Sequence, residues 1–199
     1  MRNSKSQKTL FPTNSSNNDQ YQKHHELSLG KEVLLNWQKK IETYQSSFFS
    51  GTQSNHKQGT LFIGDDKVSL DNFAPLNLTP LPLSFWRWPK CSHTGPAIYL
   101  VMDKLEQSNS HILLYIGETL TADRRWKGEH DCKAYLAAYS EALCNAAIQS
   151  QLSIRFWSDV PSDTRSRRKL EQQLINKWLP PFNKETRARW STPFTAKIN

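Results

Sequence analysis

The sequence predicts a small α/β protein in which a central antiparallel sheet of about three strands is flanked by helices. Residues 96–102 and 111–117 are rich in β-branched and aromatic side chains, which favour strands. Residues 103–110 between them are polar and turn-like, so the two strands are expected to form an antiparallel hairpin. Residues 152–157 alternate in polarity and predict a third strand.

Helices that flank this sheet are predicted over residues 132–147 and 164–179, with a short one that begins at Thr121 or Asp123. In the last of these helices, apolar residues recur at four-residue intervals and define the core side: Leu170, Leu174 and Trp178. Glu171 lies about 100° round the helix from Leu170, so we expect it to face a cleft.

The chain divides into a polar tail over residues 1–28, a connecting part over 29–90, and the predicted domain over 91–199. The tail holds too few apolar side chains to fold and is predicted to be disordered. The connecting part begins with an amphipathic helix over 29–49 and ends with an irregular arm over 75–89, where prolines forbid helix. The arm carries large aromatic residues, which we expect to pack on the domain, with base stacking as the alternative: Phe85, Trp86 and Trp88.

The formal charge of +8 and the pI near 9.4 favour a polyanionic partner. The charge is uneven, because residues 155–199 hold ten Lys or Arg against four Asp or Glu. A basic face that serves only solubility is the alternative interpretation of charge alone.

Cysteine usage and hydropathy bound the compartment. The three cysteines form neither an even disulfide set nor paired knuckles, and their neighbouring histidines lack the spacing of a zinc site. No apolar run approaches the roughly 18 residues of a membrane span, and the N-terminus lacks a signal core. We therefore expect a cytoplasmic protein with no membrane association.

Two tyrosine tripeptides stand in the predicted hairpin, Ala97-Ile98-Tyr99 and Tyr115-Ile116-Gly117. Arg125-Trp126-Lys127 follows ten positions after Tyr115, and a helix from Glu171 ends in the sequence Pro-Pro-Phe-Asn183. In order and spacing, these elements resemble the GIY-YIG nuclease family over about residues 95–183. The longer separation of the two tyrosines suggests an inserted loop, and their even spacing places both on one face if no bulge intervenes.

The resemblance implies a metal-dependent DNA endonuclease. It implies that Glu171 binds Mg²⁺, with Mn²⁺ as an alternative, and that Arg125 holds a phosphate oxygen. It further implies that Tyr99 is the general base for the attacking water and that Tyr115 orients the water or the phosphate. A phenol can take this role near neutral pH only if nearby cations favour the phenolate.

Other positions complete the predicted site or depart from the family pattern. Asn183 and His130 are further catalytic candidates, although Asn183 also suits a turn and His130 lies one position beyond good helical spacing from Arg125. Arg124 is an alternative to Arg125 if the helix register differs. Glu118 is unexpected, because a carboxylate repels phosphate unless it binds metal or turns away. The predicted nucleic-acid contacts are Arg124, Lys127, Arg167, Arg168 and Lys184.

One short pattern, Q-x-T-L-F, occurs at Gln7–Phe11 and again at Gln58–Phe62. It resembles the peptide with which bacterial repair and replication proteins dock on the sliding clamp, and two adjacent apolar anchors suit a groove. Chance repetition in a Gln- and Thr-rich region is the alternative. The sequence as a whole predicts a DNA endonuclease, for example in repair, with a catalytically inactive DNA-binding or clamp-associated module as the other interpretation.

Overall fold

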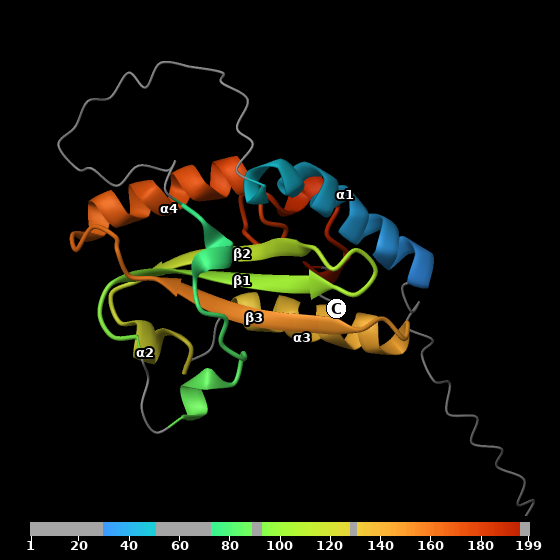
Figure 1. The fold of residues 1–199 in the computed structure, drawn as a ribbon, viewed down its shortest axis with the longest axis horizontal. Helices are drawn as coiled ribbons and strands as arrows, with labels where there is room; N and C mark the ends of the chain where they lie inside the picture. The colour runs from blue at the N-terminus through green and yellow to red at the C-terminus, as the bar shows by residue number, and fades with distance from the viewer. Residues whose placement is uncertain (1–29, 51–72, 89–92, 128–130, 196–199) are drawn as a thin grey trace, which may run out of the picture.

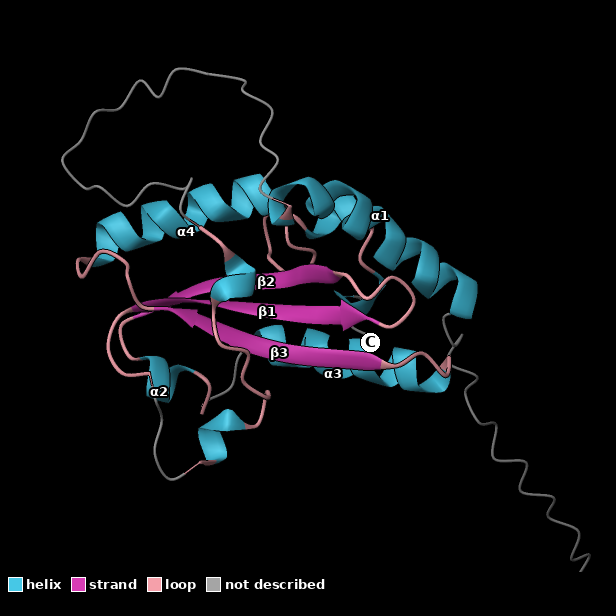
Figure 2. Cartoon of the chain, viewed as in Figure 1, coloured by secondary structure: helices cyan, strands magenta, loops and turns pink. Residues whose placement is uncertain are grey.

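The computed structural model describes residues 30–50, 73–88, 93–127 and 131–195. Its strands are β1 (Ala97–Leu105), β2 (His111–Thr119) and β3 (Ser150–Trp157). Its α-helices are α1 (Lys31–Phe49), α2 (Ala122–Arg125), α3 (Asp131–Asn145) and α4 (Thr164–Trp178). The strands form one antiparallel sheet in the order β2-β1-β3, with helices around it, so the predicted coarse fold is confirmed (Figure 2).

The hairpin differs from the prediction, because β1 continues through Asp103 to Leu105 and only residues 106–110 connect it to β2. The carboxylate of Asp103 is buried and accepts hydrogen bonds from the Tyr139 hydroxyl at 2.7 Å, the Ser150 hydroxyl at 2.9 Å and the Gln151 amide at 2.8 Å. These bonds let a polar residue continue the strand. The prediction of an inserted loop is therefore wrong, because the additional residues lengthen the two strands and only a short turn connects them.

Both tyrosines lie on the same face of this hairpin. Tyr99 is paired with Gly117 and Val101 with Tyr115, whereas Met102 is paired with Leu113. The register shift thus leaves Leu114 as an extra residue in β2, on the turn side of both tyrosines. The bulge changes the side on which β2 residues point only between Tyr115 and the turn, at Leu114 and before it. Tyr99 and Tyr115 therefore share one face, as expected.

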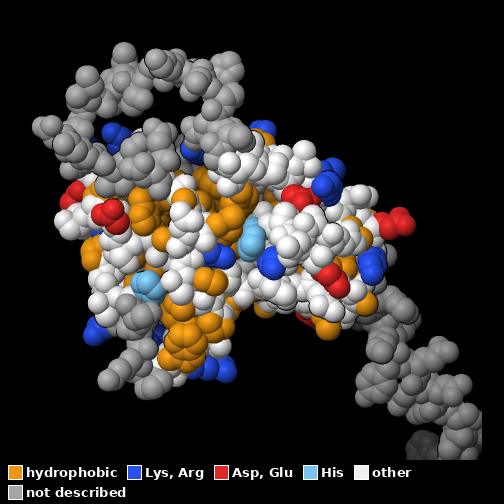
Figure 3. All heavy atoms as spheres, in the orientation of Figure 1, with side chains coloured by type: hydrophobic (Ala, Val, Ile, Leu, Met, Phe, Trp, Pro, Cys, Tyr) orange, Lys and Arg blue, Asp and Glu red, His pale blue; other side chains and the backbone are white. Residues whose placement is uncertain are grey.

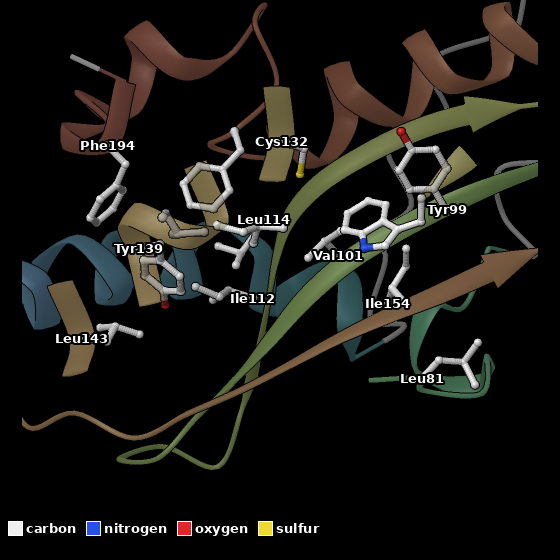
Figure 4. Packing of buried hydrophobic residues seen from close by; sticks show 14 of the residues in the cluster. Leu81, Tyr99, Val101, Ile112, Leu114, Cys132, Tyr139, Leu143, Ile154 and Phe194 are labelled. Carbon is white, nitrogen blue, oxygen red and sulfur yellow. The ribbon is translucent and has the colours of Figure 1, made fainter. Parts of the chain in front are cut away.

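Two apolar layers cover the sheet. The α3-side cluster packs α3 and part of α1 on one face, and its largest fully buried side chains include Tyr99, Tyr139, Phe85 and Phe182. The α4-side cluster packs α4 on the other face through the predicted residues Leu170, Leu174 and Trp178. Figure 1 shows α1 and α4 along the β2 side of the sheet and α3 on the β3 side, partly behind that strand. Figure 4 shows the α3-side cluster.

The outer edge of β2 is paired by groups that come from outside the sheet. The side-chain amide of Gln45 in α1 accepts from the Leu113 amide at 2.7 Å and donates to the Leu113 carbonyl at 3.0 Å. The Phe182 amide donates to the carbonyl of the bulge residue Leu114 at 3.0 Å. An edge strand left open would invite pairing with another chain, and these contacts close it.

The arm over residues 73–88 lies along the opposite edge, against β3. Leu81 and Ile154 exchange backbone hydrogen bonds at 2.8 and 2.9 Å, and Phe85 is buried against Phe156 with ring centroids 5.2 Å apart. The buried guanidinium of Arg155 donates to three arm carbonyls: Pro75, Leu76 and Leu78. The arm has no α-helix in its described residues, but it includes two short 3-10 helices, η2 (Pro75–Asn77) and η3 (Phe85–Arg87), where the sequence predicted no helix. Both the arm and α1 contribute to the clusters that form the core.

Candidate active site

The two tyrosines are adjacent on the α3-side face. Their rings stack with centroids 5.9 Å apart and an interplanar angle of 29°. Tyr99 is fully buried, whereas Tyr115 is partly buried. In Figure 4 the Tyr99 hydroxyl points from β1 toward β2.

Gly117 leaves the space that the Tyr99 ring occupies. A β-carbon built on Gly117 would lie 2.4 Å from both the Cζ and the hydroxyl oxygen of Tyr99. Real β-carbons do not approach other atoms so closely, so the close approach requires glycine at this position. The glycine of the second tripeptide therefore positions the first tyrosine, which sequence reasoning did not foresee.

Gly117→Ala is expected to displace the Tyr99 ring and to lower the free energy of unfolding by about 1–3 kcal/mol, because the surrounding core is closely packed. Urea unfolding followed by circular dichroism measures this change. Gly30→Ala is the control, since a β-carbon there meets nothing within 4 Å, and its expected change is below about 1 kcal/mol. Equal effects of the two substitutions would contradict the proposed role of Gly117.

Helix α2 brings Arg125 to Tyr99. Its start is fixed by a bond of 3.0 Å from the Ala122 amide to the carbonyl of Gly95, whose φ of 84° favours glycine. Its end is fixed by Trp126, which is 2% exposed and meets the Tyr99 ring edge to face with centroids 5.9 Å apart. The exposed Arg125 then donates from Nε to the Tyr99 hydroxyl at 3.3 Å.

Both phenols are hard to ionise. Burial raises the pKa of Tyr99 to about 12, although the neighbouring Arg125 guanidinium acts to lower it. Burial also raises the pKa of Tyr115, and the charges of nearby groups, including the Glu171 carboxylate, add to the rise. The requirement that cations favour the phenolate is thus not met by Arg125 alone, because burial has the larger effect.

Glu171 reaches the site from α4, the helix that packs on the sheet face opposite to the tyrosines. Its Oε1 accepts a hydrogen bond of 3.0 Å from the Glu118 amide at the outer edge of β2. Burial raises the pKa of Glu171 to about 7, and the charges of Glu118 and Glu185 contribute. The Glu118 amide directly follows Gly117 in β2, so this hydrogen bond places the carboxylate at the outer edge of β2, next to the second tripeptide.

The Glu118 side chain points toward α4 and forms ion pairs with two of its arginines. Its Oε2 accepts from Arg167 Nε at 2.9 Å, and its Oε1 accepts from Arg168 Nε at 3.2 Å. The Arg167 side chain is completely buried and also donates to the carbonyls of Pro161 and Ser162. The prediction that Arg167 contacts nucleic acid is corrected here, because its guanidinium is enclosed and bound. The neutralised Glu118 presents less negative charge to a phosphate.

Asn183 pairs with the backbone of β2. Its Oδ1 accepts from the Ile116 amide at 3.0 Å, and its Nδ2 donates to the Ile116 carbonyl at 2.8 Å. The side chain is buried, and it acts as one further residue of a neighbouring strand. These bonds hold β2 between Tyr115 and Gly117, so Asn183 positions the site rather than reaching a phosphate.

The remaining predicted residues divide by exposure. Arg124, Lys127, Arg168 and Lys184 are exposed to solvent. Three predicted elements lie outside the described residues: His130, Gln7–Phe11 and Gln58–Phe62. The catalytic role of His130 and docking on the sliding clamp therefore stay predictions.

The donor set near Glu171 suits a hard divalent cation. Mg²⁺ is usually held by one or two carboxylates together with substrate phosphate and water, rather than by an all-protein cage. Within the described parts of the chain, no three His, Cys, Asp or Glu gather into such a cage. Glu171 instead offers a single, partly buried carboxylate whose ionised form is disfavoured by burial and by its acidic neighbours. A cation beside it would relieve that cost, so the residues present fit the metal.

Comparison of the chain with models of known protein families, with curated proteins and with solved structures finds no match. Among the helices that the structure describes, none has the length and apolar character needed to cross a membrane.

Proposed function

We propose that this protein is a Mg²⁺-dependent endonuclease that hydrolyses DNA phosphodiester bonds, as in the GIY-YIG nucleases that its motifs resemble. The observation that carries the proposal is the stacked pair Tyr99 and Tyr115 with Arg125 bound at the Tyr99 hydroxyl, while the Glu171 carboxylate is held at the amide that follows Gly117. A base, a guanidinium and a metal-binding carboxylate are the groups that phosphodiester hydrolysis requires.

Arg125 is the residue suited to the phosphate. Its side chain is exposed, and its Nε bond of 3.3 Å to the Tyr99 hydroxyl places the guanidinium beside the proposed base. The other nitrogen donors of an arginine can bind phosphate oxygens by charge-assisted hydrogen bonds, which strengthen as charge builds there. A phosphate bound by Arg125 would therefore lie close to the Tyr99 hydroxyl.

Glu171 is the residue that would hold the metal. A Mg²⁺ ion bound there would neutralise phosphate charge and supply the positive charge that Tyr99 needs in order to lose its proton. The Glu118 amide fixes one carboxylate oxygen of Glu171 at 3.0 Å, and so orients the other.

Tyr99 is the proposed general base, and its task depends on ionisation. With a pKa raised to about 12 by burial, it stays a neutral phenol at pH 7 in the protein alone. In that state its buried hydroxyl accepts the hydrogen bond of Arg125, so a water would reach it only when Arg125 shifts toward a bound phosphate. The proton transfer therefore awaits substrate and cation, which restricts hydrolysis to the assembled complex.

A supercoiled plasmid tests the proposal. The purified protein is expected to convert it to nicked and linear forms with Mg²⁺ or Mn²⁺, and to leave it intact with a chelator. Gel electrophoresis measures the conversion. Intact plasmid under every metal condition, with the protein folded and bound to DNA, would contradict the proposal.

The second candidate is a module that binds DNA without cutting it. The raised pKa values of both phenols favour it, because they oppose base catalysis unless a cation is bound. Plasmid retention in a gel-shift assay without any nicking would be its signature.

A further inference from the structure

Next to the tyrosine site, aromatic rings alternate with cations on the surface. Trp86, Arg87 and Trp88 lie at the end of the described part of the arm, and Lys133 in α3 lies near the Trp86 ring. The guanidinium of Arg87 lies 5.0 Å from the centroid of the Trp86 ring, and the Lys133 ammonium lies 5.7 Å from the same centroid. We call Trp86, Arg87, Trp88 and Lys133 the arm surface.

Packed side chains connect the arm surface to the proposed active site. Lys133 also lies 5.7 Å from the Trp126 ring centroid and donates to the Trp126 carbonyl at 2.5 Å. Trp126 in turn contacts the ring of Tyr99. A row of contacts thus runs from the arm to the proposed catalytic tyrosine, past the exposed cations Arg125 and Lys127.

The arm surface is held rigidly but leaves one ring open. Phe85 is 1% exposed and packs on Phe156, and the Leu81 bridge to β3 fixes the arm just before it. Trp88, by contrast, is 48% exposed, although large aromatic side chains usually gain most by burial. Figure 3 shows hydrophobic side chains gathered, with Lys and Arg beside them, where Figure 1 draws the arm in green below the sheet.

We propose that the arm surface binds unpaired nucleotides of DNA next to the scissile phosphate. Inside a duplex both faces of a base are covered by neighbouring base pairs, so an exposed tryptophan stacks most readily on a base that is unpaired. The interleaved cations match the phosphates that connect such bases. Charge complementarity therefore favours nucleic acid over an apolar protein partner.

This inference rests on the proposed function and adds its substrate class. An endonuclease with a stacking surface beside its base acts on DNA in which a single strand adjoins the cut, such as a flap, a branch or a gap. The duplex on the other side of the cut would be bound by the exposed cations, which contact backbone phosphates and do not distinguish sequence.

Binding of fluorescein-labelled oligonucleotides, followed by anisotropy in a chelator so that nothing is cut, tests the inference. The probes are a single strand, a flapped duplex and a blunt duplex of equal length. Wild type is expected to bind the first two more tightly than the blunt duplex. Trp88→Ala is expected to weaken their binding by about 5- to 150-fold, the equivalent of one stacked base. It should change blunt-duplex binding less than twofold.

Two variants control for folding and for general hydrophobicity. Trp88→Phe keeps a stacking ring and is expected to retain most of the affinity. Leu76→Ala removes another exposed apolar side chain, 42% exposed and on the same arm, and is expected to leave binding unchanged. Unchanged single-strand binding by Trp88→Ala, or equal binding of all three probes by wild type, overturns the inference.

The outcomes also separate this inference from the nuclease proposal. Trp88-dependent binding of single strands without any cleavage supports the arm surface and rejects the nuclease. Metal-dependent cleavage that is indifferent to Trp88 and to unpaired nucleotides supports the nuclease and rejects the arm surface.

Discussion

Glu171→Gln is expected to lower the single-turnover rate of DNA cleavage by about 10³-fold or more, equivalent to at least about 4 kcal/mol of transition-state stabilisation. Glutamine keeps an oxygen that accepts the bond from the Glu118 amide, so the edge of β2 stays paired. It has no charge with which to hold a divalent cation. Cleavage of an end-labelled duplex with a flap, at saturating protein, measures the loss.

The same substitution is expected to stabilise the protein above neutral pH. Burial and the neighbouring carboxylates raise the pKa of Glu171 to about 7 from 4.5. Between these values the unfolded chain has released the proton while the folded protein keeps it, so stability falls as pH rises from about 4.5 to 7. Glutamine does not titrate and lacks this fall. At pH 8 the variant should gain about 1–2 kcal/mol over wild type, relative to the difference at pH 4.

Lost cleavage together with gained stability is a combination that damage to the fold cannot produce. It is the behaviour expected where a functional group is kept at a cost to stability. Glu141→Gln removes an exposed carboxylate from α3 and should change neither property. Full cleavage by Glu171→Gln would remove Glu171 from the site, and a loss of both properties would mark it as structural.

Arg167→Met is expected to lower the free energy of unfolding by about 3–5 kcal/mol, because it leaves the Glu118 carboxylate without its buried partner. The enclosed guanidinium also satisfies the carbonyls of Pro161 and Ser162 at the start of α4, at 3.1 and 2.9 Å. Methionine fills part of the volume but donates no hydrogen bond. Urea unfolding monitored by tryptophan fluorescence measures the change.

Arg168→Met is the matched control, since Arg168 binds the same carboxylate but its side chain is 68% exposed. Its expected cost is below about 1 kcal/mol. Adding Glu118→Gln to Arg167→Met should recover part of the loss by removing the charge that has lost its buried partner. If the two arginine variants cost the same, the ion pair of Arg167 with Glu118 is not what holds α4 to β2.

An element of the fold could be predicted where the apolar pattern of its own residues defines its buried side. The four-residue spacing of Leu170, Leu174 and Trp178 gave α4 its buried side, and Asp163 caps its start through a bond of 3.0 Å from the Ser166 amide. The length of β1 could not be predicted, because Asp103 is polar. The partners that keep it in the strand come from α3 and from the start of β3.

The candidate site likewise has residues that the sequence could predict and residues whose roles only the tertiary contacts reveal. The motif spacing led to Tyr99, Arg125 and Glu171, but the roles of Arg167 and Asn183 depend on contacts between distant parts of the chain. An arginine in a basic helix suits DNA as well as a buried carboxylate, and only packing decides between them. The unexpected Glu118 was the available signal, since a carboxylate in such a site needs a cation.

The central claim, that separate side chains act on one phosphate, is tested most directly by the single-turnover cleavage rate of the double variant Tyr99→Phe, Arg125→Ala. Groups that act as a unit are strongly non-additive. The double variant is therefore expected to cut about as slowly as the slower of the two single variants. Losses that multiply, or a wild type that does not cut DNA with any divalent ion, would contradict the account.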